Sequence, residues 1–550
     1  MHPMRFLRHI SLRHFDTTGL ILGTLFFAVS LTPTLLPRAD LVQAILSGVS
    51  FAVGYGVGVL GHRLWQYLEL PEPRPRIQWY VQVIAASICG IIALVFLWQA
   101  GTWQNAVREL MGMEERGGLQ LLMIAAVAAL TFLILWLLGC LFGWIARSTS
   151  QRMQRFVPRR ISNVAGVVLA LAVFWTLIDG VFFSMALRSV DASYQQVDAL
   201  MEPEFPAPED PESVGGADSV LDWDDMGRHG RRFLSRGPSP AELQAFTGEP
   251  APDPIRVYVG MHASDSPEER ATLALEELRR VDAFDRSVLV LVTPTGTGWV
   301  DQAAMDPLEY LHRGDIASVA AQYSYLPSPV SLMAEGDYGA EMARALFREV
   351  YDYWTRLDPE ERPELYLHGL SLGALNADLS HDLYDIIQDP FHGALYSGPP
   401  FRKQTWRDIT ERRQEDSPAW LPVFRDGSVV RFANQDGGLE EAEAEWGHYR
   451  VAYLQYASDP VTFFDPDSFI REPEWMQEPR GPDVSESLRW FPIVTGLQLA
   501  ADMGVGVSPV GYGHDYAAEH YIDAWVALTE PEGWDEEDLE RLRERFREKR

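Results

Sequence analysis

The chain has 550 residues and a formal net charge of −31, and the charge is unevenly distributed. Residues 1–190 carry 15 Lys and Arg against 8 Asp and Glu, whereas residues 191–550 carry 31 against 69. A chain of this length needs more than one core, and the acidic half argues against nucleic acid as a partner, because phosphate binding requires clustered Lys and Arg.

The first 190 residues contain five apolar runs long enough to cross a bilayer, which takes about 20 residues of helix. The predicted spans lie near 17–36, 40–61, 77–99, 119–145 and 163–185. Both cysteines of the chain, Cys89 and Cys140, fall inside these runs, so the acidic half has no disulfide framework and no cysteine-based zinc site. Residues 1–190 are therefore predicted to form a transmembrane domain surrounded by the lipid bilayer.

Basic loops predict the orientation of these spans, because Lys and Arg accumulate on the cytoplasmic side. With five spans, three basic stretches fall on one side: Arg5, Arg8 and Arg13; Arg63, Arg74 and Arg76; and Arg147, Arg152, Arg155, Arg159 and Arg160. We therefore expect a cytoplasmic N-terminus and an extracytoplasmic acidic half.

Proline and glycine within the first two spans allow two interpretations. Pro33, Gly54, Gly56 and Gly58 could mark the broken helices of a transporter, or ordinary helix ends and packing faces. The ordinary interpretation is favoured, because few ionisable groups accompany them. Asp179, the one clear acid within a span, could be a relay or a polar contact between helices, and its place near the outer end favours an interfacial group.

Residues 191–250 are predicted to connect the two halves. Val190, Tyr194, Val197 and Met201 recur at helical spacing and indicate a short amphipathic extension. Residues 202–219 combine Pro, Gly and acidic residues without periodicity, which is typical of a linker.

From about residue 251 to 530, β-rich apolar runs alternate with helical patterns, which predicts an α/β domain with a mostly parallel sheet covered on both faces. The expected strands lie within 255–259, 287–293, 317–325, 365–367, 393–397, 428–433 and 451–457, with helices at 267–280, 339–356 and 375–387. Residues 531–550 predict a charged C-terminal surface helix with Leu539, Leu542 and Phe546 on one face.

The stretch LYLHGLSLGA, residues 365–374, places Ser371 between Gly369 and Gly373, behind a predicted strand and before a predicted helix. This arrangement predicts a nucleophile elbow, a sharp turn that exposes a serine hydroxyl. Side chains at the two glycines would collide with the neighbouring strand and helix. Ser371 is thus the predicted nucleophile, and the fold is predicted to be α/β-hydrolase-like.

A serine nucleophile needs a base and an acid that orients it, and in this fold they follow in the order acid, then histidine. Asp459 follows the predicted strand 451–457, with Asp436 and Asp465 as reserves. His514 lies in the glycine-rich loop GYGHDY and is preferred as the base. His520 is expected to face solvent or packing, and His368 is expected to be buried.

The oxyanion formed during acyl transfer needs two donors. The first is predicted to be the backbone N–H of Leu372, and the second is assigned to the loop TPTGTGW, residues 293–299, at Thr295 or Gly296. The loop lacks the lysine of a phosphate-binding loop.

Several ordered motifs together resemble a bacterial family of membrane-anchored α/β-hydrolases with a multi-span N-terminal domain. They include GRRFLSRGPS (230–239), GDIASVAAQYSYLPSPVSL (314–332), LHGLSLGA (367–374), ALYSGPPF (394–401) and WFPIVTGLQLAADM (490–503). The resemblance covers nearly the whole chain and implies a serine-hydrolase-like domain outside the membrane, with Ser371, Asp459 and His514 at the triad positions. Leu370 departs from the pattern, because an acidic residue is expected there more often.

The leading functional prediction is a hydrolase of esters or thioesters, of esterase or lipase type, that acts on a lipid or envelope-linked substrate at the bacterial cell membrane. The same triad could instead transfer the acyl group to an alcohol. A second class of function is a transport or partner-binding protein with a degenerate hydrolase domain. No metal cluster stands out and the chemistry requires no cofactor; the oligomeric state is left open.

Overall fold

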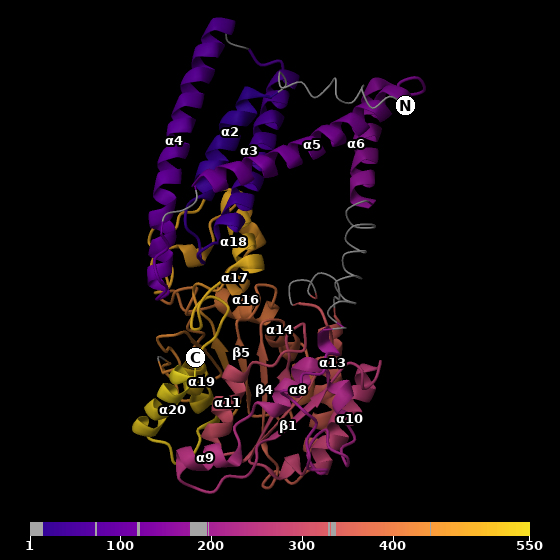
Figure 1. The fold of residues 1–550 in the computed structure, drawn as a ribbon, viewed down its shortest axis with the longest axis vertical. Helices are drawn as coiled ribbons and strands as arrows, with labels where there is room; N and C mark the ends of the chain where they lie inside the picture. The colour runs from indigo at the N-terminus through magenta and orange to yellow at the C-terminus, as the bar shows by residue number, and fades with distance from the viewer. Residues whose placement is uncertain are drawn as a thin grey trace. The chain divides into compact units, whose positions relative to one another are not determined.

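The computed structural model describes residues 15–71, 74–117, 121–176, 195, 197–327, 331, 337–440 and 442–549 (Figure 1). The chain divides into two compact units. Unit 1 comprises the described residues of Met1–Ser184 together with Phe464–Glu478 and Asp483–Pro509. Unit 2 comprises the described residues of Met185–Phe463 together with Pro479–Pro482 and Val510–Arg550.

Unit 2 is built on a parallel sheet that contains seven strands within the described residues, in the order β1-β3-β2-β4-β5-β7-β6. The strands are β1 (Ile255–Val259), β2 (Val288–Thr293), β3 (Ile316–Ala321), β4 (Glu364–Leu370), β5 (Gly393–Ser397), β6 (Val430–Ala433) and β7 (Arg450–Leu454). Each overlaps one predicted run, so the predicted α/β class is confirmed.

Helices cover both faces of this sheet, as Figure 1 shows. On one side, α10 (Pro267–Arg280) packs on α13 (Tyr338–Trp354), which in turn contacts α14 (Leu372–Asp378). On the other side, α19 (Ala518–Thr529) packs between α11 (Gln302–Leu311) and α20 (Glu536–Glu548). Two covered faces explain why the strands are apolar throughout rather than alternating.

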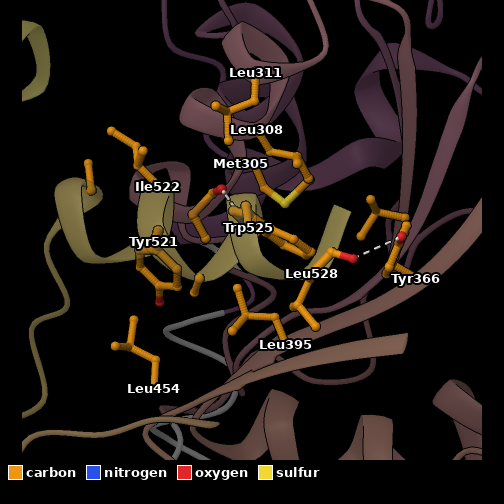
Figure 2. Close-up of a cluster of buried hydrophobic side chains, with 14 of the residues drawn as sticks. Met305, Leu308, Leu311, Tyr366, Leu395, Leu454, Tyr521, Ile522, Trp525 and Leu528 are labelled. Carbon is orange, nitrogen blue, oxygen red and sulfur yellow. Dashed lines mark hydrogen bonds between the residues drawn. The ribbon is translucent and has the colours of Figure 1, made fainter. Parts of the chain in front are cut away.

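The core lies between the sheet and α19 (Figure 2). Val288, Val290 and Val292 of β2 point to the same face, as alternate strand residues must, and join this cluster. The indole of Trp525 is fully buried within it and donates to the Ala304 carbonyl at 2.9 Å. Helix α20 lies where the sequence predicts a C-terminal helix, and its apolar residues Leu539, Leu542 and Phe546 are buried.

Unit 1 is helical. Its elements are α2 (Thr17–Ser30), α3 (Asp40–Tyr67), α4 (Pro75–Leu110), α5 (Leu121–Met153), α6 (Arg159–Trp175), η5 (Pro466–Phe469), η6 (Glu474–Met476) and α18 (Val494–Val505). Helices α2 and α3 pack closely, because a Cβ on Gly58 would lie 2.6 Å from the Cα of Gly19. Helix α3 is unbroken through Gly54, Gly56 and Gly58, and Gly54, whose Cβ would lie 2.8 Å from the Leu22 carbonyl oxygen of α2, fits the helix-packing interpretation together with Gly58. Gly56 does not, because no described atom outside its own helix turn lies within 4 Å of the Cβ it would carry.

The prediction of five spans is only partly confirmed. Among the described residues, three helices are long and apolar enough to cross a membrane: α3, α4 and α5. The first predicted span is shorter than expected, because α2 ends at Ser30, three residues before Pro33, and has 14 residues. Proline disfavours helix in the residue before it, which limits the helix on this side. Helix α6 is described to Trp175, and the remainder of the fifth predicted span, including Asp179, lies outside the described residues.

The segment predicted as a linker is fixed to unit 2. Glu202 pairs with Arg228 at 3.0 Å, and Glu277 of α10 accepts from the Ser219 hydroxyl at 2.6 Å and from the Val220 N–H at 3.1 Å. Three short helices follow within 220–250: η3 (Trp223–Met226), α8 (Gly227–Ser235) and α9 (Pro240–Thr247). Pro and Gly prevent long regular elements here, but side chains of the domain still accept hydrogen bonds from backbone N–H groups of this segment. Val190 and Tyr194 lie outside the described residues.

Candidate active site

Ser371 occupies a one-residue turn between β4, which ends at Leu370, and α14, which begins at Leu372. Its backbone has φ 58° and ψ −124°, a conformation that non-glycine residues rarely adopt. Strain of this kind persists only where the surroundings hold it, and it concentrates at functional sites. One such restraint is the hydrogen bond from the Ser371 N–H to the Ser397 carbonyl of β5, at 2.9 Å.

The two glycines that flank Ser371 are required by close backbone packing. A Cβ on Gly369 would lie 2.3 Å from the carbonyl carbon of Gly373, and a Cβ on Gly373 would lie 2.2 Å from the carbonyl oxygen of Thr293. Backbone atoms at these distances cannot move aside as a flexible side chain can. The predicted strand, turn and helix of a nucleophile elbow are therefore all present.

Asp459 and His514 lie together although 55 positions separate them along the chain. His514 Nδ1 is 2.7 Å from Asp459 Oδ2, and the Asp459 carboxylate is completely buried. The same carboxylate accepts from the Val461 N–H at 2.8 Å, from the Thr462 hydroxyl at 3.1 Å and from the Tyr516 hydroxyl at 2.7 Å. These donors compensate the buried charge and fix the orientation of the carboxylate.

The environment of His514 suits a base. Burial works to lower the pKa of His514, but the nearby charge of Asp459 and the hydrogen bond to it outweigh burial and leave the pKa above its ordinary value. With Nδ1 turned to Asp459, the opposite nitrogen, Nε2, is buried and has no hydrogen-bond partner among the described residues. A neutral imidazole held in this way presents Nε2 as a proton acceptor.

Gly398 links the serine to the imidazole in space. It follows Ser397, whose carbonyl accepts from the Ser371 N–H, and it has φ +49°. A Cβ at Gly398 would lie 2.6 Å from Cε1 of His514, so the imidazole packs directly against this residue. The structure thus brings Ser371, His514 and Asp459 to the carboxyl ends of β4, β5 and β7, the edge of a parallel sheet where ligands bind.

The predicted oxyanion donors lie beside the elbow. Leu372 is the first residue of α14, where backbone N–H groups have no partner within the helix. The loop 293–299 begins at Thr293, which pairs with Gly369 in the sheet. Within the loop, the Thr295 N–H already donates to the Trp299 carbonyl at 2.9 Å, so donation to an oxyanion would require that bond to open. The assignment of the second donor to Thr295 or Gly296 stays a prediction.

The other candidates for the base and the acid are His368, His520, Asp436 and Asp465. They lie in other environments. His368 is buried, its Nδ1 is 3.0 Å from the Leu395 carbonyl, and burial lowers its pKa to about 4. His520 packs on Tyr456, whose hydroxyl is 2.5 Å from its Nδ1. Asp436 is exposed, and Asp465 caps a short helix through the Asp467 N–H. None of these four pairs with Asp459 or His514 in the part of the chain that the structure describes.

Leu370 stands where the family resemblance predicts an acidic residue more often. Its side chain is buried and belongs to the hydrophobic core cluster. A carboxylate there would be desolvated without a partner, so leucine suits this packing.

Two residues beside the candidate site, Tyr516 and Asp301, are absent from the sequence-based predictions. Tyr516 donates to the same Asp459 oxygen that His514 contacts, and its ring stacks on Tyr456 with centroids 4.4 Å apart. Asp301 accepts from the Tyr521 hydroxyl at 3.0 Å, and burial raises its pKa to about 7. The only signal available was proximity: Tyr516 lies two positions after His514, and Asp301 directly follows the loop 293–299.

Metal ligands are not grouped in the described residues, which contain no cluster of three or more His, Cys, Asp or Glu side chains able to hold a metal ion. The chemistry available at this site is that of a serine, an imidazole, a carboxylate and backbone donors. This set performs acyl transfer in proteins.

The parallel sheet, the elbow after β4 and the order serine, aspartate, histidine define an α/β-hydrolase fold. A family model described as an alpha/beta-hydrolase family matches residues 255–542, and the model of that family's N-terminus matches residues 31–238. The chain therefore belongs to this α/β-hydrolase family. Neither the curated proteins nor the solved structures contain a match to it.

Proposed function

We propose that the protein is a membrane-attached serine hydrolase that cleaves esters or thioesters through an acyl-enzyme on Ser371. One observation carries this proposal: His514 bonds to buried Asp459 at 2.7 Å through Nδ1, while its Nε2 is unpartnered within the described chain. Such a pair in an elbow fold has the composition that serine acylation needs.

In the first half of the proposed reaction, Ser371 Oγ attacks the acyl carbonyl carbon and His514 Nε2 takes the hydroxyl proton. The carbonyl π electrons move to oxygen, and the Leu372 N–H donates to the resulting oxyanion. One oxyanion donor typically stabilises the transition state by about 3–4 kcal/mol. The imidazolium then protonates the leaving alcohol or thiol as its bond to the carbonyl carbon breaks, which leaves an acyl ester on Ser371.

In the second half, water attacks the acyl-enzyme, and His514 first accepts the proton of water and then returns it to Ser371 Oγ. Asp459 holds Nδ1 and stabilises the positive charge on the ring. Its buried hydrogen bonds from Val461 and Thr462 keep this orientation through both halves.

The membrane location indicates the substrate class. Helices α3, α4 and α5 suit a bilayer, and the family's N-terminal model covers them. A hydrolase attached in this way acts on substrates concentrated at the same membrane, so we propose a lipid or envelope-linked ester at a bacterial cell membrane.

The proposed orientation has a cytoplasmic N-terminus and an extracytoplasmic hydrolase domain. This orientation requires five crossings, by α2 and α6 as well as α3, α4 and α5. With fewer crossings the basic stretches would not all lie on the same side of the membrane. As a helix, the 14 residues of α2 span roughly 21 Å, less than the ~30 Å hydrocarbon core, so the loop after α2 would complete the crossing. Protease added to intact cells should cleave the hydrolase domain; protection of the domain until the cells are lysed would reverse the orientation.

The activity test uses the full chain in nanodiscs with p-nitrophenyl esters and thioesters of increasing acyl length. We expect hydrolysis that Ser371→Ala abolishes. Ser380→Ala is the matched control, because Ser380 is also buried and, among the described residues, its hydroxyl bonds to the Ala377 carbonyl and to His381, outside the candidate site. Added alcohols would reveal acyl transfer as ester products. Hydrolysis that persists in Ser371→Ala would refute the mechanism, and its absence from wild type across the panel would favour a binding role.

A further inference from the structure

The chain between the proposed catalytic acid and base does not stay in the hydrolase domain. Asp459 and His514 belong to unit 2, but residues 464–478 and 483–509 belong to unit 1 with the N-terminal helices. The sequence predicts a single hydrolase domain over 251–530 that would include this stretch. The family's WFPIVTGLQLAADM motif, residues 490–503, falls within this excursion and has no role in the chemistry described above.

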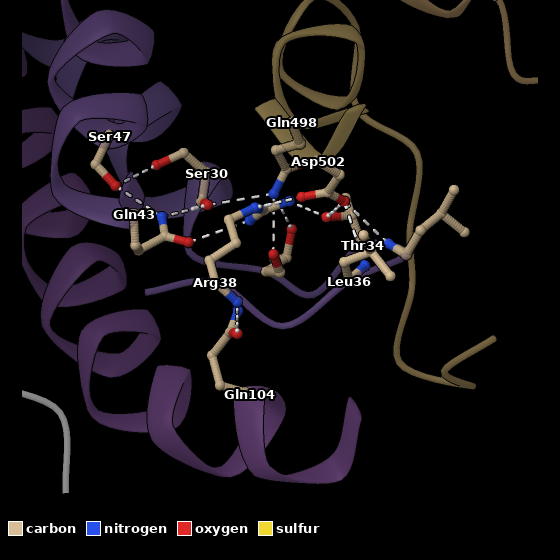
Figure 3. A network of polar contacts seen from close by, with 11 residues as sticks. Ser30, Thr34, Leu36, Arg38, Gln43, Ser47, Gln104, Gln498 and Asp502 are labelled. Atoms are coloured by element: carbon tan, nitrogen blue, oxygen red, sulfur yellow. Dashed lines mark hydrogen bonds and ion pairs between the residues drawn. The ribbon is translucent and has the colours of Figure 1, made fainter. Parts of the chain in front are cut away.

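Helix α18 of this excursion binds the loop that joins α2 to α3. Gln498 and Asp502 lie one turn apart on the same face of α18. The Gln498 amide donates to the Thr32 carbonyl at 2.9 Å and to the Ser30 carbonyl at 3.2 Å. The Asp502 carboxylate accepts from the Thr34 hydroxyl at 2.6 Å and from the Leu35 N–H at 3.2 Å (Figure 3).

Arg38, at the other end of this loop, completes the contact. Its Nε lies 2.7 Å from Asp502 Oδ1, and the two side chains are 1% and 0% exposed. The guanidinium also bonds to Gln43 at 3.1 Å and to Thr34, while the Arg38 N–H donates to Gln104 of α4 at 2.9 Å (Figure 3). Removing either member of a buried ion pair leaves the other charge buried without a partner, which is strongly destabilising. This pair therefore holds α18 firmly against the loop.

The contact between α18 and the loop 31–39 lies at the end of α18, just before the segment that leads to His514. Helix α18 ends at Val505, and a Cβ on the next residue, Gly506, would lie 2.4 Å from Cδ1 of Leu36. The Leu36 N–H also faces Asp502, at 3.4 Å. Eight positions further along the chain is His514. The start of the loop that carries the proposed base is therefore fixed by residues of the N-terminal helical unit.

We infer that Arg38 and Asp502 are positioning residues for His514, so that the N-terminal helices contribute to catalysis and not only to attachment. This inference rests on the proposed function. If the pair is broken, α18 loosens, the loop 506–513 gains freedom, and His514 spends less time against Asp459. A pair that only stabilised unit 1 would leave the reactivity of Ser371 unchanged.

The test compares Asp502→Asn with wild type in the full chain in nanodiscs. Two quantities are followed: the rate at which a fluorophosphonate labels Ser371 across pH, and amide hydrogen exchange of residues 494–513. Asp389→Asn is the control for loss of an ion pair within unit 2, because the Asp389 carboxylate, 37% exposed, pairs with Arg362 at 2.6 Å. Arg38→Lys, which keeps the charge but not the fork of donors, serves if Asp502→Asn fails to fold.

For Asp502→Asn we expect faster amide exchange at 494–513 and unchanged exchange in β4. Labelling of Ser371 should slow about tenfold, which corresponds to a tenfold smaller population of molecules with His514 against Asp459. The midpoint of the pH profile should fall, because the carboxylates of Asp459, Asp515 and Asp301 all raise the pKa of His514 and the first would be further away. Arg38→Lys should show the same changes to a smaller extent, and Asp389→Asn should show none.

Two outcomes separate the inference from the function on which it rests. Faster exchange at 494–513 with wild-type labelling rate and midpoint would overturn the positioning role, as would unchanged exchange. No labelling of Ser371 in wild type would instead overturn the proposed function.

Discussion

The carbonyl oxygen of Thr293 lies 2.2 Å from the point that a Cβ on Gly373 would occupy. This proximity joins the two parts of the site that a nucleophile elbow needs: the turn at Ser371 and the loop 293–299 after β2. The loop is thus in place beside the first N–H groups of α14, where the oxyanion is expected to form.

Gly373→Ala should damage both stability and reactivity. Its methyl group would meet backbone at Thr293, so the turn or β2 must shift, at a cost of about 1–3 kcal/mol that lowers the melting temperature. The rate at which a fluorophosphonate labels Ser371 should also fall, because the turn that holds Ser371 is displaced. Gly139→Ala is the control, because no heavy atom of the described residues outside its own helix turn lies within 4 Å of the Cβ it would add. An unaltered melting temperature for Gly373→Ala would contradict the close packing.

Asp459→Asn should slow labelling of Ser371 by roughly 10³–10⁴-fold, because the amide cannot stabilise an imidazolium or fix its tautomer. In wild type, labelling should rise with pH through the pKa of His514, which lies above its ordinary value of about 6.5, since only the neutral ring accepts a proton. In the variant the midpoint should move down, because the charge that raises this pKa is gone.

Asp436→Asn and Asp465→Asn are the controls for that experiment. The exposed Asp436 and the helix cap Asp465 were the reserve acids, and neither contacts His514 in the described structure. A larger loss in either control than in Asp459→Asn would reassign the acid.

Tyr516→Phe should reduce labelling about tenfold without unfolding the domain. The change deletes one hydroxyl, 2.7 Å from Asp459 Oδ2, while the ring can still stack on Tyr456. A hydrogen bond to a charged group contributes about 1.5–3 kcal/mol. Because the carboxylate then has one donor fewer, its charge acts more strongly on His514 and the pH midpoint should rise, opposite to Asp459→Asn. A midpoint that falls would show that Tyr516 supports the ring of His514 rather than Asp459.

Asp301→Asn should change how stability depends on pH. Burial raises the pKa of Asp301 to about 7, so the folded protein holds this proton more tightly than the unfolded chain does. Its contribution to wild-type stability is therefore full at low pH and is lost as pH rises to about 7, by roughly 3 kcal/mol between pH 5 and pH 8.

The asparagine variant lacks this titration but can still accept from the Ala303 N–H as a helix cap. Urea unfolding at pH 5 and pH 8 should therefore show that the free energy of unfolding of Asp301→Asn rises relative to that of wild type at pH 8. Parallel pH dependence in the two proteins would mean that Asp301 is ionised in the folded state throughout.

The sequence was most informative where local pattern and tertiary structure agree. Ile255–Val259 and Gly393–Ser397 are strands with the predicted bounds, because apolar β-rich runs between turn residues have few alternatives. Ser371 was located because its glycines are demanded by local backbone contacts. The pairing of Asp459 with His514 was predicted from their order along the chain, from the strand before Asp459 and from the glycine-rich loop around His514.

Local pattern failed where distant residues decide the structure. The helix predicted over 375–387 is divided into α14 and α15 (Leu383–Ile386), because Asp382 caps a new helix. The segment 202–219 has the composition of a linker, yet Glu277 binds its end. The placement of residues 483–509 in unit 1 involves the contact of Asp502 with Arg38, more than 400 positions earlier, and no local signal connects the two.

Site-resolved labelling of Ser371 tests the central claim most directly. The full chain in nanodiscs is treated with a fluorophosphonate, and the modified residue is found by mass spectrometry of its peptides. We expect one phosphonylated residue, Ser371, with no labelling in Ser371→Ala and severely slowed labelling in His514→Ala. Absence of label in the folded wild-type protein, or equal labelling in wild type and His514→Ala, would contradict it.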